Sequence, residues 1–182
     1  MAPTCAAFNS DRTLLAFGDY SFPNTIKLWS MPSAQLIGAL DGSVNGVEYL
    51  KFSDDGKRLA VRRGGHKIEL WDMQDKKRLN GCNLWFVRSV LFSPCGNYVL
   101  LATEKGGVEK RDVANPDVCI HLLDDSEKRH GVDVMALSHD ATLLAVASSK
   151  PGSPIPVSYT HLDVYKRQGV YIVTFNIQNH VP

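Results

Sequence analysis

The five residues Phe52-Ser53-Asp54-Asp55-Gly56 indicate the architecture of the chain, because they recur as Phe92-Ser93-Pro94-Cys95-Gly96, 40 residues further along. The same frame fits Phe8-Asn9-Ser10-Asp11 upstream and Leu137-Ser138-His139-Asp140 downstream. A period of 40 to 45 residues indicates a repeat architecture, in which no unit buries its apolar face alone. We therefore expect stacked units, with function carried by the loops of one face.

Each unit holds four short apolar runs that are separated by turn residues. The third run of the second unit, Lys67–Asp72, alternates apolar and polar residues, as a strand with one buried face does. Gly, Asn, Asp and Pro stand at the joints, where tight turns need them. The sequence thus predicts antiparallel four-stranded sheets. The strands expected in the first unit are 5–8, 13–17, 25–29 and 35–40.

A Trp-Asp pair, Trp71-Asp72, ends the third run of the second unit, 19 residues after Phe52. Four strands per repeat with such a pair resemble the WD40 repeat of β-propellers. The resemblance covers residues 4 to about 148, and it implies an all-β, partial WD40-like β-propeller of about three and a half four-stranded blades. The third unit departs from the pattern, since Arg111 takes the Trp place. Unrelated antiparallel hairpins of a sandwich stay open as the alternative.

The expected domain is residues 4–148, divided into blades. Since four to eight blades close a propeller, the chain is too short for a ring of its own. An open arc would leave apolar flanks in water, at a cost comparable with the stability of a whole domain. We therefore expect a fragment, or a chain that needs the rest of its own propeller or a partner. The blades are expected at 4–46, 47–87, 88–131 and, in part, 132–148.

The repeat pattern stops after Ser149, and residues 149–182 are expected to form an irregular tail. Residues 150–156 have the Pro, Gly and Ser content of a linker. Residues 157–168 resemble a translated sequencing-adaptor artefact, which would explain why the fourth blade breaks off. A long blade insertion that binds a partner stays open as the alternative.

Composition excludes several classes of function. A net charge of +1 gives no overall attraction to nucleic acid or to an anionic membrane. No apolar run approaches the length of about 20 residues that a membrane helix needs. The first residues lack the features of a signal peptide, and the four cysteines have no Cys-x-x-Cys spacing. We expect an intracellular protein, cytoplasmic or nuclear, without membrane or nucleic-acid partners.

No chemical motif points to catalysis. The six histidines have no metal-ligand spacing such as His-x-His, and no phosphate-binding glycine loop or Gly-x-Ser-x-Gly elbow occurs. We expect no cofactor, no metal and no catalytic residue. The function expected is a non-catalytic scaffold for protein–protein interaction. The open alternative is a fragment of an enzyme propeller, either a quinoprotein-type dehydrogenase or a hydrolase, whose ligands would converge on the central channel.

One rim of the blades is the predicted binding surface. In this repeat order, the loop before the first strand and the loop between the second and third strands share a rim. Basic and aromatic side chains there would suit protein partners, including acidic or phosphorylated peptides. A purely structural role for Trp85 and Phe86, filling a blade joint, stays open. The candidate residues are Arg62, Arg63, His66, Trp85, Phe86, Arg88, Lys105 and Arg129.

Overall fold

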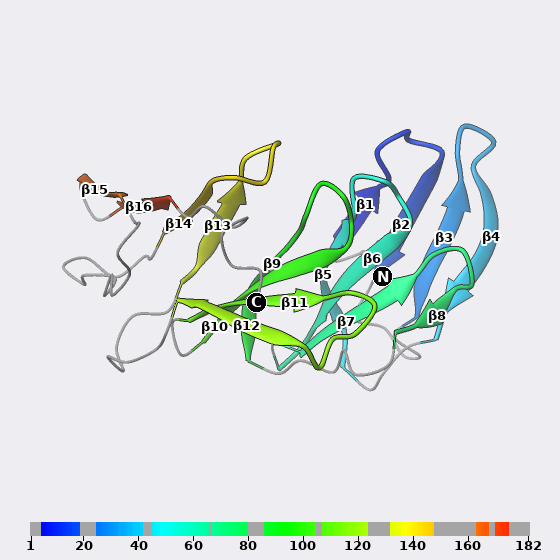
Figure 1. Ribbon diagram of the computed structural model, residues 1–182. Helices are drawn as coiled ribbons and strands as arrows, with labels where there is room; N and C mark the ends of the chain where they lie inside the picture. Colours follow the sequence, from blue (N-terminus) through cyan, green and yellow to red (C-terminus); the bar gives the residue numbers. More distant parts are fainter. Residues whose placement is uncertain are drawn as a thin grey trace. The chain divides into compact units, whose positions relative to one another are not determined.

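The computed structural model describes residues 5–18, 25–41, 45–65, 67–79, 86–104, 107–123 and 132–147, and the backbone of 163–167 and 170–174. Every regular element within these ranges is a strand (Figure 1). The described residues contain no helical segment that could cross a membrane. The chain divides into two compact units, Met1–Trp85 and Phe86–Pro182.

The first unit contains two antiparallel sheets, blade one and blade two, each ordered as its strands follow in the chain. The strands expected for blade one are confirmed to within one residue, because turn residues and alternation mark them locally. Blade one contains β1 (Cys5–Phe8), β2 (Leu14–Gly18), β3 (Ile26–Ser30) and β4 (Gln35–Leu40). Blade two contains β5 (Val47–Phe52), β6 (Arg58–Arg63), β7 (Lys67–Asp72) and β8 (Lys77–Arg78).

The core of the first unit is made by both of its blades. On β3, Ile26 and Leu28 are buried whereas Lys27 is exposed, which is the alternation of a strand with one covered face. Strands β2 and β5 approach so closely that a Cβ at Gly18 would lie 2.6 Å from Cγ1 of Val47. Glycine at this position therefore allows blade one to pack on blade two. The buried cluster consists of Ala16, Ile26, Leu28, Leu40, Val47, Leu50, Phe52, Leu59, Val61, Trp71 and Met73.

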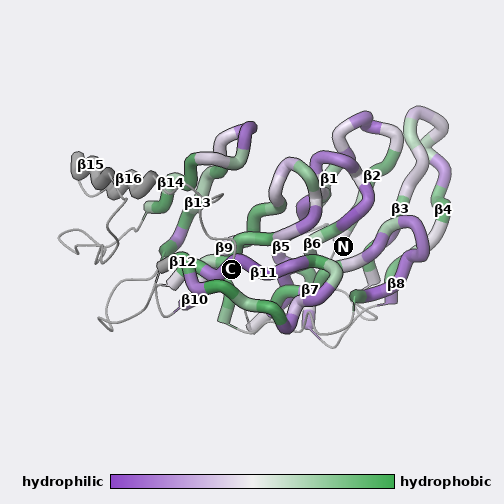
Figure 2. Tube along the Cα trace, in the orientation of Figure 1, coloured by the Kyte–Doolittle hydropathy of each residue, from purple (hydrophilic) through white to green (hydrophobic). Residues whose placement is uncertain are grey.

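The second unit contains one four-stranded sheet, blade three, and two strand pairs. Its apolar residues concentrate in strands such as β10 and β14, whereas β8 of the first unit is hydrophilic (Figure 2). Blade three contains β9 (Val87–Phe92), β10 (Tyr98–Thr103), β11 (Val108–Asp112) and β12 (Cys119–Leu123). The partial blade four contains β13 (Val134–Leu137) and β14 (Leu144–Ala147). A buried cluster joins these blades: Leu100, Ala102, Val108, Leu122, Val132, Met135, Leu144 and Val146.

The tail contains two short strands. Strand β15 (Asp163–Arg167) pairs antiparallel with β16 (Val170–Thr174), and β16 contacts β14. The pairing partner of β16 lies within the stretch that resembles an adaptor. The foreign origin of residues 157–168 stays a prediction.

The recurring Phe-Ser-x-x-Gly stretch encodes the turn between the first and second strands. In blade two, the hydroxyl of Ser53 donates to Oδ1 of Asp55 (2.6 Å), and the N–H of Lys57 donates to the same oxygen (3.0 Å). Gly56 then adopts a φ of 69°, which favours glycine. The turn of blade four repeats the first of these bonds, since Ser138 donates to Asp140 over 2.6 Å. The motif is therefore a hydrogen-bonded turn.

Blade three carries a thiol where the other turns carry a carboxylate. Sγ of Cys95 lies 3.4 Å from Oγ of Ser93. The side-chain hydrogen bond with Ser93 and the backbone N–H of Asn97 lower the pKa of the Cys95 thiol. In blade two, burial would raise the pKa of Asp55, but hydrogen bonds from Ser53 and Lys57 hold it below its usual value. Both turns thus favour an anion at this position.

Replacing Cys95 with aspartate is expected to raise the free energy of unfolding by about 0.5–1 kcal/mol. The carboxylate would accept hydrogen bonds from Ser93 and from the Asn97 backbone, as Asp55 does in blade two. A carboxyl whose pKa is lower in the folded protein than in the unfolded chain stabilises the folded state. The full stabilisation is present above the unfolded pKa, about 3.9, and it is lost as the pH falls through the folded pKa. Urea unfolding at neutral and acid pH, with C95A as control, measures the gain. An unchanged or lower midpoint for C95D at neutral pH would contradict the expectation.

Candidate functional site

In blade two and in blade three, the loop before the first strand is hydrogen-bonded to the loop between the second and third strands. The N–H of Gly64 donates to the carbonyl of Gly46 (3.0 Å), and Nδ2 of Asn45 donates to the carbonyl of Gly64 (2.8 Å). In blade three the N–H of Glu104 donates to the carbonyl of Phe86 (2.7 Å). These bonds bring both loops to one edge of each blade, as the repeat order led us to expect. We call this edge the upper rim.

Arg62 is the predicted site residue that blade two presents best at its upper rim. Its Nε lies 3.4 Å from Oε2 of Glu48, and its guanidinium lies 5.9 Å from the centre of the Tyr49 ring. Both neighbours come from β5, where Tyr49 is exposed and is the register partner of Arg62. Partial burial of its side chain raises the pKa of Tyr49, and the Arg62 charge opposes this. The arginine is thus held in place while part of its side chain still meets solvent.

Arg63 was wrongly expected on this surface. Its side chain is fully buried, and its Nε donates to Oε2 of Glu69 over 2.9 Å. Successive residues of a strand point to opposite faces, so Arg63 turns inward where Arg62 turns outward. Glu69 is also buried and is approached by Lys67 (3.3 Å) and Arg78 (3.4 Å). Burial would raise the pKa of Glu69, but the bond from Arg63 and the nearby positive charges hold it below its usual value.

Blade three presents Phe86 and Arg88. Phe86 is 59% exposed and has a φ of 62°, which directs the chain into β9. Arg88 forms an ion pair with Asp133, a residue that directly precedes the first strand of blade four. The N–H of Asp133 also donates to the carbonyl of Ala147 (2.9 Å). Arg88 therefore links two blades of its unit, and part of its side chain remains accessible.

Every predicted arginine in the described part of the chain has a carboxylate beside it, so the rim is less basic than its arginine content indicates. Sequence reasoning missed Glu48, Tyr49 and Asp133. Glu48 and Tyr49 could have been found from their place at the start of a first strand. No local signal connects Asp133 with Arg88, 45 residues earlier. The remaining predicted site residues, His66, Trp85, Lys105 and Arg129, lie outside the described residues.

Antiparallel sheets of four strands, packed face to face in the first unit and repeated in the second, define a β-propeller fold. Among solved structures, the β-propeller domain of Cps50 (Swd1) from Myceliophteria thermophila matches with a TM-score of 0.64. Its sequence is 22% identical, and the match covers 81% of this chain and 49% of that one. The fold is therefore a partial WD40-like β-propeller, as the repeat predicted.

Sequence comparison gives two relatives, although no protein-family model matches. The pre-mRNA-processing factor 19 homolog 2 of Arabidopsis thaliana is 28% identical over 99 residues, 54% of this chain and 18% of that protein. The U3 small nucleolar RNA-associated protein 18 homolog of Mus musculus is 28% identical over 137 residues, 68% of this chain and 23% of that protein. The chain thus spans about a fifth of the length of these curated relatives. The chain is thus similar in sequence to parts of these two proteins and similar in fold to a β-propeller domain.

Proposed function

We propose that this chain is a non-catalytic scaffold for protein–protein interaction and that its partner binds at the upper rim. The observation that carries the proposal is the fixed position of Arg62 between Glu48 and Tyr49. A side chain that is already ordered loses little conformational freedom when a partner binds, so more of the contact energy appears as affinity. Arginine and tyrosine are also the residue types that binding hot spots favour.

The proposed partner is a protein with an acidic or phosphorylated segment. The part-exposed guanidinium of Arg62 can donate to a carboxylate or phosphate, in place of its ion pair with Glu48 or beside it. On blade three, Arg88 offers the same chemistry, and the exposed Phe86 offers an apolar contact next to it. We assign no binding role to Arg63, because its charge is already used inside the blade.

The two curated relatives suggest where such a scaffold would act. Their names place one in pre-mRNA processing and the other with the U3 small nucleolar RNA. We propose a nuclear location and protein partners within an RNA-processing assembly. Under this proposal the chain contacts the proteins of the assembly, and its net charge of +1 is in keeping with this.

Reversing the charge of Arg62 tests the proposed surface. R62E in the full-length protein is expected to weaken capture of co-purifying partners by about 10-fold, which corresponds to about 1.4 kcal/mol. The matched control is K57E, the same charge reversal at an exposed residue of the turn between strands one and two of blade two. Quantitative mass spectrometry of tagged, folded variants measures the loss. Equal partner recovery with R62E, or a selective loss with K57E, would place the interface elsewhere.

A further inference from the structure

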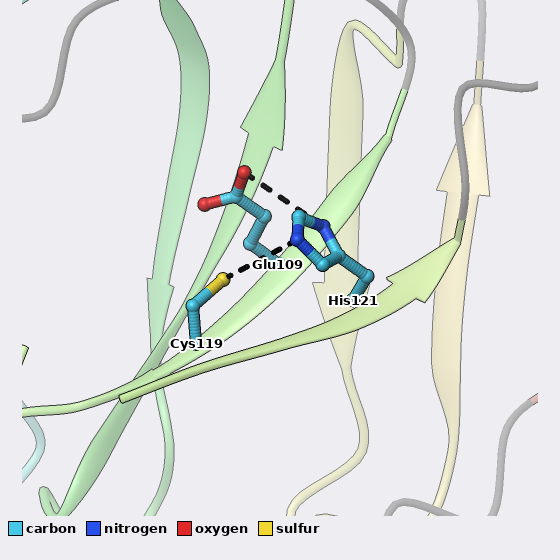
Figure 3. A group of neighbouring side chains, drawn as sticks. All are labelled: Glu109, Cys119 and His121. Carbon is cyan, nitrogen blue, oxygen red and sulfur yellow. Dashed lines mark hydrogen bonds and ion pairs between the residues drawn. The ribbon is translucent and has the colours of Figure 1, made fainter. Parts of the chain in front are cut away.

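Three metal-binding types of side chain meet on the outer strands of blade three: the carboxylate of Glu109, the thiol of Cys119 and the imidazole of His121 (Figure 3). Strand β12 is at the edge of its sheet, and its residues Cys119 and His121, two apart, point to the same face. In the register with β11, Glu109 lies opposite His121, and Arg111 lies opposite Cys119. The strand pairing therefore brings Glu109 next to two residues that lie ten and twelve positions further along the chain.

The donor atoms of the cluster lie close but do not bond strongly to one another. Sγ of Cys119 is 4.0 Å from Nε2 of His121, and Nδ1 of His121 is 4.0 Å from Oε1 of Glu109. A nucleophilic thiol needs its base within about 2.6–3.2 Å. Burial, followed by the Glu109 charge, also raises the pKa of the Cys119 thiol, whereas an activated thiol has a lowered pKa. The arrangement does not suit a catalytic cysteine.

We propose that Glu109, Cys119 and His121 form a binding site for a zinc-like divalent cation. Thiolate, imidazole and carboxylate are the ligands that Zn²⁺ takes, and three protein ligands leave a fourth position for water. Ligands around a tetrahedral zinc ion lie roughly 3.5 Å apart, given bonds of about 2.0–2.3 Å. The donor atoms here all lie within 4.8 Å of one another. The side chain of His121 is 62% exposed, so it can turn to close the remaining gap.

Arg111 acts as a positioning residue for this site. Its Nε and Nη2 lie 2.9 and 2.8 Å from the same oxygen of Glu109, Oε2, which leaves Oε1 on the side of His121. Nη1 of Arg111 also donates to the carbonyl of Pro116 (2.9 Å), so the guanidinium is itself held in place. Hydrogen bonds of this kind orient the ligands of metal sites.

Binding exchanges one proton for one metal ion. The thiol of Cys119 must lose its proton to the solvent as the sulfur–metal bond forms, because the thiolate is the ligand. The thiolate and the Glu109 carboxylate then supply two negative charges next to the cation, while Arg111 keeps its own positive charge at the other carboxylate oxygen. The signal in the sequence is Cys119-Ile120-His121, a Cys-x-His pair on one face of a strand, which a search for paired histidines does not detect.

Titration of the whole chain with Zn²⁺ alone by calorimetry tests the site, and Co²⁺ absorbance reports a thiolate ligand. We expect one ion per chain, with affinity lowered at least about 10-fold in C119S and in H121Q, and loss of the thiolate-to-cobalt band in C119S. The matched controls are C95S, at an exposed thiol of the same blade, and H139Q, at a histidine of blade four. Both controls should bind as the unchanged chain does. Circular dichroism confirms that each variant is folded.

Three results would overturn the proposal. The folded chain could take up no Zn²⁺, C119S and H121Q could both bind Zn²⁺ as tightly as the unchanged chain, or C95S could lose as much affinity as C119S. The last result would assign the binding to the Cys95 thiol instead. If R62E loses partner capture but still binds Zn²⁺, the metal site is separate from the proposed interaction surface. The same follows if C119S loses Zn²⁺ binding but still captures partners.

Discussion

Replacement of Glu69 by alanine is expected to lower the free energy of unfolding by about 3–5 kcal/mol. Glu69 is buried and accepts a 2.9 Å hydrogen bond from the fully buried Arg63. Without the carboxylate, the buried Arg63 guanidinium loses the hydrogen bond from its Nε to Glu69 and the negative charge beside it. The positive charges of Lys67 and Arg78 nearby would then oppose it further. Urea unfolding measures the loss.

The double variant R63M/E69L is the control for this prediction. Removing both charges leaves no uncompensated charge in the interior, and apolar side chains of similar size fill the space, so most of the loss should be recovered. Because the pKa of Glu69 is lowered, the free energy of unfolding also depends on pH. The stabilisation by the Glu69 carboxylate is fully present above the unfolded pKa, about 4.3, and it is lost as the pH falls through the folded pKa. A double variant as unstable as E69A would contradict the account.

Replacement of Trp71 by alanine is expected to lower the free energy of unfolding by about 3–5 kcal/mol. Trp71 is only 6% exposed and belongs to the buried cluster of the first unit. Its indole N–H is buried and has no hydrogen-bond partner among the described residues. W71F keeps most of the apolar volume and removes this unsatisfied donor, so it should lose less than half as much.

Trp29 provides the matched control, because it occupies the same repeat position in blade one. Its side chain is only half-buried and is not part of the buried cluster. W29A should therefore cost clearly less than W71A when both are measured by urea unfolding. Equal losses for the two alanine variants, or a W71F variant as unstable as W71A, would show that the repeat position rather than burial determines the effect.

Local sequence signals were sufficient for the strands. The alternation in Ile26–Ser30 and the turn residues around Ser53 and Asp55 act over a few residues, so they can be recognised in a single chain. The assignment of both rim loops to one edge also followed from the repeat order. The sequence did not predict that Arg63 is buried while Arg62 is partly exposed, because two consecutive basic residues do not reveal which of them faces the core.

The period, the strands and the turn that each repeat shares can be read from the amino-acid sequence alone, since they depend on near neighbours and on a pattern that recurs. Which charges are compensated, and which metal-binding side chains come together, depends on the folded chain. Arg88 meets Asp133 across 45 residues, Arg63 enters the interior to reach Glu69, and Glu109 lies beside His121 across a strand pair with a register shift. Such contacts depend on strand register and blade packing, because side chains distant in sequence meet only after the backbone hydrogen bonds have fixed which residues lie opposite one another.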